Sequence, residues 1–139
     1  MKKDVMISLV GNQTDGEDTE QIELITEGRY YSEGCSHFVT YDETEVTGLA
    51  GTTTTLKIED GRITMTRAGQ NNSQLVFEKG QRHLCSYETP FGVFMIGIRS
   101  NDVRIDLGES EGVISADYLI EFDNNASGHN DFRMHFKVC

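Results

Sequence analysis

A ten-residue segment of alternating character constrains the fold more than any other part of the chain. It reads Leu56-Lys57-Ile58-Glu59-Asp60-Gly61-Arg62-Ile63-Thr64-Met65. Asp-Gly between two alternating runs is typical of a two-residue hairpin turn, whose central positions need positive φ. This turn sets Glu59 opposite Arg62 and Ile58 opposite Ile63, so apolar pairs share one face and polar pairs the other. The segment therefore predicts a half-buried antiparallel hairpin.

The same alternation with a period of two runs through most of the remaining chain. It is clearest in segments 103–107, 114–122 and 132–138, which predict an antiparallel meander with loops at 108–112 and 124–128. Earlier strands are expected at 5–10, 22–30, 37–45, 75–77, 82–89 and 91–99, with a polar loop at 12–18 and a break at 48–51. These segments predict eight to ten strands and no helix.

The composition agrees with an all-β chain, because Val, Ile, Thr, Tyr and Phe greatly outnumber Ala and Leu. Antiparallel strands in up-and-down order leave two exposed edges unless the sheet closes. A closed barrel removes these edges and, at this strand number, is wide enough for one small ligand. We therefore expect a single antiparallel β-barrel domain over residues 1–139, with a two-sheet sandwich as the alternative.

Charge and cysteine content bear on partners and compartment. A net charge of −11 disfavours electrostatic binding to nucleic acid or to an anionic membrane. The three cysteines are widely spaced and no apolar leader follows the first residues, so the sequence predicts reduced thiols in a cytoplasmic protein. The acidic stretches 15–20, 42–45 and 109–111 are expected to be solvated loops, with a docking surface for a basic partner as the alternative.

Four short motifs, in this order and spacing, resemble one protein family. They are Thr26-x-Gly28-x-Tyr30-Tyr31, Thr64-x-x-Arg67-x-Gly69, Phe77-x-x-Gly80 and Tyr87-x-x-Pro90-Phe91-Gly92. Together they resemble the YwiB-like family of small bacterial β-barrels, a domain of unknown function. The resemblance extends from about residue 5 to 136 and implies a lipocalin-like (calycin) barrel in the cytoplasm. It implies no reaction and no particular ligand.

Arg67 is the strongest candidate for a ligand-binding residue. Extending the hairpin alternation from Ile63 and Met65 places Arg67 on the same inward face. A buried arginine needs a carboxylate, a carbonyl, water or an anionic ligand, because an unpaired buried charge is costly. The sequence leaves two interpretations open. Arg67 is an anion-binding fork in a pocket, or it has a structural role, either paired with a partner such as Glu88 or Asp42 or placed at a strand end already in solvent.

Thr26, Tyr30, Tyr87 and Tyr118 are expected to line the same interior, although packing is an alternative role for each tyrosine. Segment 87–92 is expected to be a structural turn, or alternatively a portal loop with Phe91 as its lid. The four histidines lack the spacing of a metal site, and no phosphate-binding loop, dinucleotide motif or catalytic triad is recognisable. Haem held in the barrel mouth by one histidine is the remaining cofactor alternative.

The leading prediction is therefore non-catalytic binding of a small amphipathic or anionic ligand in the barrel interior, with no cofactor. The alternative is a solid-cored barrel that acts through its surface as an adaptor or homodimer. In that alternative, Phe122, Phe132, Met134 and Phe136 would fill the interior. An enzyme is a third class that no constellation of residues supports.

Overall fold

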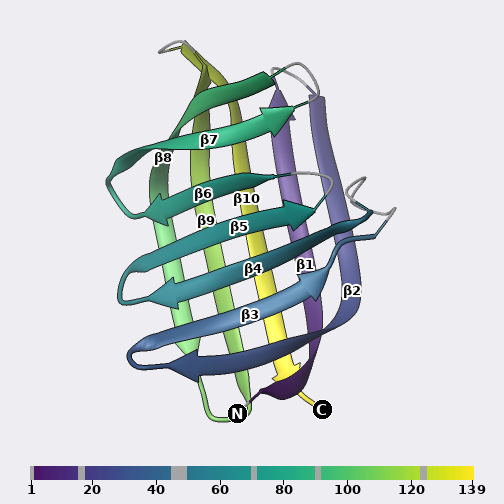
Figure 1. The fold of residues 1–139 in the computed structure, drawn as a ribbon. Coiled ribbons are helices and arrows are strands. Elements are labelled where there is room, and N and C mark those ends of the chain that lie inside the picture. Colours follow the sequence, from purple (N-terminus) through teal and green to yellow (C-terminus); the bar gives the residue numbers. More distant parts are fainter. Residues whose placement is uncertain (1, 16–17, 45–49, 70–71, 90–91, 123–124) are drawn as a thin grey trace.

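The computed structural model describes residues 2–15, 18–44, 50–69, 72–89, 92–122 and 125–139, and this part of the chain contains strands and no helix. The ten strands are β1 Lys3–Asp15, β2 Asp18–Glu33, β3 Ser36–Asp42, β4 Thr52–Glu59, β5 Arg62–Gly69, β6 Ser73–Glu78, β7 Arg82–Thr89, β8 Gly92–Leu107, β9 Glu111–Phe122 and β10 Asn125–Val138. Each strand pairs antiparallel with the next, and β1 pairs with β10, which closes the barrel (Figure 1). The predicted up-and-down barrel is thus confirmed.

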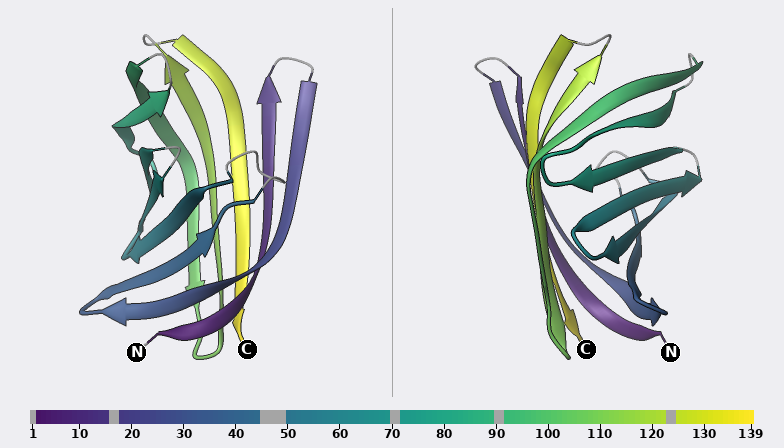
Figure 2. Two further views of the ribbon diagram at one scale, coloured as in Figure 1. Left: turned by 45° about the vertical axis from the view of Figure 1, so that its right-hand side comes forward. Right: turned by 90° about the vertical axis from the view of Figure 1, so that its left-hand side faces the viewer.

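The barrel has two walls whose strands run in different directions. The long strands β1, β8, β9 and β10 form one wall, and the shorter strands β3 to β7 cross in front of them in Figure 1, while Figure 2 shows the two walls from the side. Strand β2 joins the walls by pairing first with β1 and then with β3. At this transition, a Cβ on Gly28 would lie 2.4 Å from Ile7 Cδ1 and 2.5 Å from the Thr40 carbonyl oxygen. Only glycine permits this close approach of β2 to its neighbours.

The predicted hairpin is confirmed in its register. Residues 56–59 of β4 pair with residues 62–65 of β5, with Ile58 opposite Ile63 and Glu59 opposite Arg62. Gly61 has φ +72° in the turn, the conformation that the Asp-Gly signal requires.

Three predicted boundaries are wrong. The polar loop expected at 12–18 is mostly strand, because β1 continues to Asp15 and β2 begins at Asp18. The turn expected at 124–128 is largely part of β10, with a register shift between Ala126 and Gly128. The segments 91–99 and 103–107 belong to one strand, β8, in which Asn101 is the extra residue of a bulge. In each case backbone pairing continues through polar side chains, which local polarity could not reveal. The break expected at 48–51 lies mostly outside the described residues.

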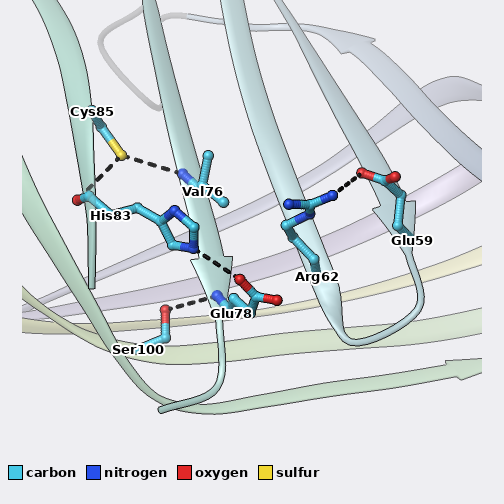
Figure 3. Close-up of polar contacts among 7 residues, drawn as sticks. All are labelled: Glu59, Arg62, Val76, Glu78, His83, Cys85 and Ser100. Carbon is cyan, nitrogen blue, oxygen red and sulfur yellow. Dashed lines mark hydrogen bonds and ion pairs between the residues drawn. The ribbon is translucent and has the colours of Figure 1, made fainter. Parts of the chain in front are cut away.

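Strands β6 and β7 pair over only two positions, Ser73 with Tyr87 and Gln74 with Ser86. Beyond these positions, side chains close the wall (Figure 3). The Val76 N–H donates to Cys85 Sγ at 3.4 Å, and the Glu78 N–H donates to Ser100 Oγ at 3.2 Å. These bonds satisfy backbone donors that would otherwise be orphaned in a buried wall.

One hydrogen bond and two ion pairs reinforce the same region. His83 Nε2 lies 3.0 Å from Glu78 Oε1 across the gap between β7 and β6 (Figure 3). Glu121 on β9 accepts from Arg82 Nε at 2.6 Å and from Arg99 Nε at 3.1 Å. Glu121 therefore bridges β7, β8 and β9 on the outer face.

Candidate functional site

A single row of inward-facing positions crosses five strands of the barrel near one end of β3 to β7, the right-hand end in Figure 1. Each member lies opposite the next in the strand register, and the row consists of Tyr41, Thr54, Arg67, Ser73 and Tyr87. We call these five residues the polar row. Two residues along each strand, the corresponding positions are Val39, Leu56, Met65 and Leu75, all buried. The inner face of these strands is therefore apolar at these four positions and becomes polar two residues further along, at the polar row.

Arg67 occupies the middle of the polar row on β5. Its side chain is half-buried, and its Nε is the one buried side-chain nitrogen or oxygen without a hydrogen-bond partner in the described part of the chain. Neither structural partner expected for it takes up this Nε. Asp42 is exposed and accepts from Thr53 Oγ1 at 2.9 Å, while Glu88 is exposed near the end of β7. The Arg67 side chain therefore lies toward the interior, and no carboxylate of the described residues accepts a hydrogen bond from its Nε.

Glu43 lies just beyond β3 and is only 6% exposed. Its Oε1 accepts a 2.6 Å hydrogen bond from Thr54 Oγ1, and its carboxylate also shares a hydrogen bond with Tyr41. Burial raises the pKa of the Tyr41 phenol strongly, and the Glu43 carboxylate adds to this rise, whereas the Arg67 charge opposes it. Glu43 and Arg67 therefore both act on the same phenol, with opposite effects.

Tyr118 connects the polar row to the floor of the interior. Its ring packs against Phe77 at a centroid distance of 4.7 Å, and Phe77 in turn packs against Phe132 at 5.3 Å. Burial raises the pKa of Tyr118 to about 12, with the nearby Arg67 charge opposing the rise. The phenol consequently remains protonated, and able to donate a hydrogen bond, at any physiological pH.

Five of these residues, namely Tyr41, Glu43, Arg67, Tyr87 and Tyr118, line a cavity of about 470 Å³. From the strands that cross the front it is lined by Tyr41, Glu43, Met65, Arg67, Leu75 and Tyr87; from the long strands and β2 it is lined by Leu9, Gly11, Asn12, Gln13, Ile22, Ile96, Tyr118, Ile120, Asn130, Asp131 and Phe132. The volume falls within the range of small-molecule sites, and the mainly apolar lining with a few convergent polar groups is their usual character.

Comparisons with known proteins agree with this architecture. A family model described as "Domain of unknown function (DUF1934)" matches residues 7–134. The chain belongs to this family. A crystal structure of the ywiB protein from Bacillus subtilis superimposes with a TM-score of 0.88 at 20% identity, covering 99% of this chain and 93% of that one. The resemblance inferred from the four motifs is thereby confirmed. No match is found among curated proteins.

The structure brings together three of the five residues predicted for the site. Arg67, Tyr87 and Tyr118 all line the cavity. Thr26 and Tyr30 lie outside its lining. Tyr30 instead stacks on Phe136 at 5.2 Å, and its hydroxyl hydrogen-bonds His37 Nδ1 at 2.7 Å.

Thr26 has a different place again. It is half-buried on β2 opposite Ile7, and its hydroxyl donates to the neighbouring Glu27 carbonyl at 3.5 Å. The inward face expected for Thr26 and Tyr30 therefore does not bring either residue to the cavity.

Glu43 is a lining residue that the sequence does not single out. The solvated loop expected at 42–45 is wrong for Glu43, which is buried against Thr54. The signal that could have found it is the continued alternation from Val39 and Tyr41, which gives residue 43 the same inward orientation.

Of the residues expected to fill the interior, Phe132, Met134 and Phe136 are buried, while the Phe122 side chain lies outside the described residues. Pro90 and Phe91, the expected turn and lid, also lie outside them. The described chain contains no group of three or more His, Cys, Asp or Glu side chains placed to hold a metal ion. Over the same residues there is no helix long and apolar enough to span a membrane.

Proposed function

We propose that this protein binds a small anionic or amphipathic molecule, without catalysis, in the cavity at the polar row. The observation that carries the proposal is Arg67, whose Nε is buried beside the cavity without a hydrogen-bond partner. Leaving a buried donor unsatisfied costs about 1–3 kcal/mol, so this arrangement gains most from an acceptor supplied from outside the chain. A carboxylate or phosphate suits a guanidinium best, because its two oxygens match the planar fork.

The surrounding residues support the same function. Met65, Leu75 and Phe132 give the cavity an apolar floor, and Tyr118 and Tyr87 add aromatic surface with polar tips. A ligand with an apolar body and an anionic head fits this division. The solid-cored alternative is less favoured, since the interior is densely packed only up to the row that contains Met65 and Leu75.

The free cysteines support a reducing compartment for this function. Cys35, Cys85 and Cys139 are all unbonded thiols, and the net charge of −11 opposes binding to nucleic acid or anionic lipid. We therefore place the proposed binding activity in the cytoplasm, with a small molecule rather than a polyanion as its partner.

An NMR titration tests the proposal. Protein labelled with ¹³C at methionine methyl groups and at tyrosine rings would be titrated with octanoate, 3-phenylpropanoate and benzyl phosphate. We expect at least one of these anions to shift the signals of Met65 and Tyr118 while leaving Tyr31, on the outer face, unchanged. The Arg67→Met variant should lose that shift. If none of the three anions shifted Met65 or Tyr118, the proposal would be wrong.

A further inference from the structure

The charges around the cavity bear on which anions it can hold. Arg67 is the one cationic side chain among the described residues that line it. Glu43 places a carboxylate in the same part of the interior, bonded to Thr54, which is the cross-strand neighbour of Arg67. The positive charge of Arg67 on β5 and the negative charge of Glu43 just beyond β3 therefore balance each other.

Asp131, the other acidic lining residue, does not add a second interior carboxylate. Its neighbours Asn130 and Phe132 are buried, so alternation puts the Asp131 side chain on the outer face. There its Oδ1 accepts from Asn12 Nδ2 at 2.8 Å, and the two residues are directly paired across β1 and β10. The Asp131 charge still acts on the Tyr118 phenol, whose pKa it helps to raise. Arg67 and Glu43 are therefore the two charged lining side chains directed into the interior.

The floor limits the shape of a ligand. Phe77, Phe132 and Tyr118 form an aromatic cluster with centroid distances of 4.7, 5.3 and 6.5 Å, and two of its rings, Phe132 and Tyr118, line the cavity. A long alkyl chain cannot extend through this floor, whereas a ring or a short branched body can rest on it. Aromatic groups favour tilted or edge contacts of the kind these rings already make with each other.

We infer that the ligand is a compact monocarboxylate with an aromatic or branched body, and that Glu43 selects it over dianions such as phosphate monoesters. This inference rests on the proposed function and narrows it. A single carboxylate would meet Arg67 and leave the interior with one net negative charge. A phosphate monoester, which carries nearly two charges above its second pKa of about 6, would add a second charge close to the buried Glu43 carboxylate. Like charges in a site shielded from water repel strongly.

Matched probes test the inference by titration calorimetry at pH 7.5. The probes are 3-phenylpropanoate and benzyl phosphate, which have nearly the same shape but differ in charge, together with neutral 3-phenylpropanamide and long-chain dodecanoate. We expect 3-phenylpropanoate to bind the unmodified protein at least tenfold more tightly than each of the other three. This comparison requires no variant, so it remains decisive if a substitution impairs folding.

Two variants then assign the selectivity. Glu43→Gln keeps an acceptor for Thr54 while removing the charge, and should strengthen benzyl phosphate binding at least fivefold relative to 3-phenylpropanoate. Asp42→Asn is the matched control, since it removes the same charge from the adjacent exposed residue and should leave the ratio unchanged.

The outcomes separate the two proposals. Benzyl phosphate or dodecanoate binding as tightly as 3-phenylpropanoate, with Arg67 required, would overturn this inference and leave the proposed function standing. An equal effect of Glu43→Gln and Asp42→Asn would overturn the role of Glu43. If no probe bound, both the inference and the proposed function would be wrong.

Discussion

Replacing Arg67 with methionine should stabilise the ligand-free protein. Methionine keeps an unbranched apolar stem but removes the guanidinium, whose Nε is buried without a hydrogen-bond partner. An unsatisfied buried donor costs about 1–3 kcal/mol, so the free energy of unfolding should rise by about that amount in Arg67→Met. The rise should appear in urea unfolding as a higher midpoint with an unchanged slope, using protein refolded from denaturant to remove bound small molecules.

Arg62→Met on the same strand is the matched control. Arg62 is 43% exposed and lies 3.6 Å from Glu59 in a surface ion pair, so its loss should change stability by less than about 1 kcal/mol. If Arg67 were instead one half of a buried structural ion pair, its removal would destabilise the protein by about 3–5 kcal/mol. A destabilisation of that size would refute the argument that Arg67 serves a ligand.

Three further predictions concern the barrel itself. Gly28→Ala should destabilise the protein by about 3 kcal/mol in urea unfolding, because the added methyl would lie 2.5 Å from a backbone carbonyl oxygen that cannot move away cheaply; a change under about 1 kcal/mol would contradict this. Iodoacetamide at pH 8 should modify Cys35 and Cys139 rapidly but spare Cys85, which is 3% exposed and whose thiol pKa is raised by burial; mass spectrometry showing three fast additions would disprove it. Glu121→Gln should lower the Tm at pH 7, with the difference from the unmodified protein shrinking below about pH 4. The two arginines bonded to Glu121 hold the pKa of its carboxyl below the usual range, so the stability it adds is lost as pH falls; a difference constant between pH 7 and pH 3 would contradict this.

The barrel is predictable because its strongest signals are local. The Asp60-Gly61 turn sets one register, and that register carries the inward face along β5 from Ile63 to Arg67. Alternation along the chain is therefore enough to assign Arg67 to the interior. The same argument gives Tyr30 an inward face but cannot say that it lies against His37, away from the cavity. Alternation with a period of two shows which face of the strand a residue occupies, but it does not show how far along the barrel that residue lies.

Glu43 is a residue for which composition and alternation give opposite predictions. It stands in an acidic stretch, which by composition indicates solvent, yet it is buried because β4 brings Thr54 opposite Tyr41. The hydrogen bond from Thr54 to Glu43 joins residues 11 positions apart and satisfies the carboxylate, which permits its burial. The selectivity assigned to Glu43 depends on this nonlocal contact, which the distribution of charge along the chain does not reveal.

A native mass spectrum tests the central claim most directly. The protein and its Arg67→Met variant would each be incubated with a small-molecule extract of the cells that produce the protein, and then ionised gently. We predict a defined additional mass on the unmodified protein, lost on denaturation and absent from the variant. A bare protein mass for both, or an adduct that Arg67→Met retains equally, would contradict ligand binding through Arg67.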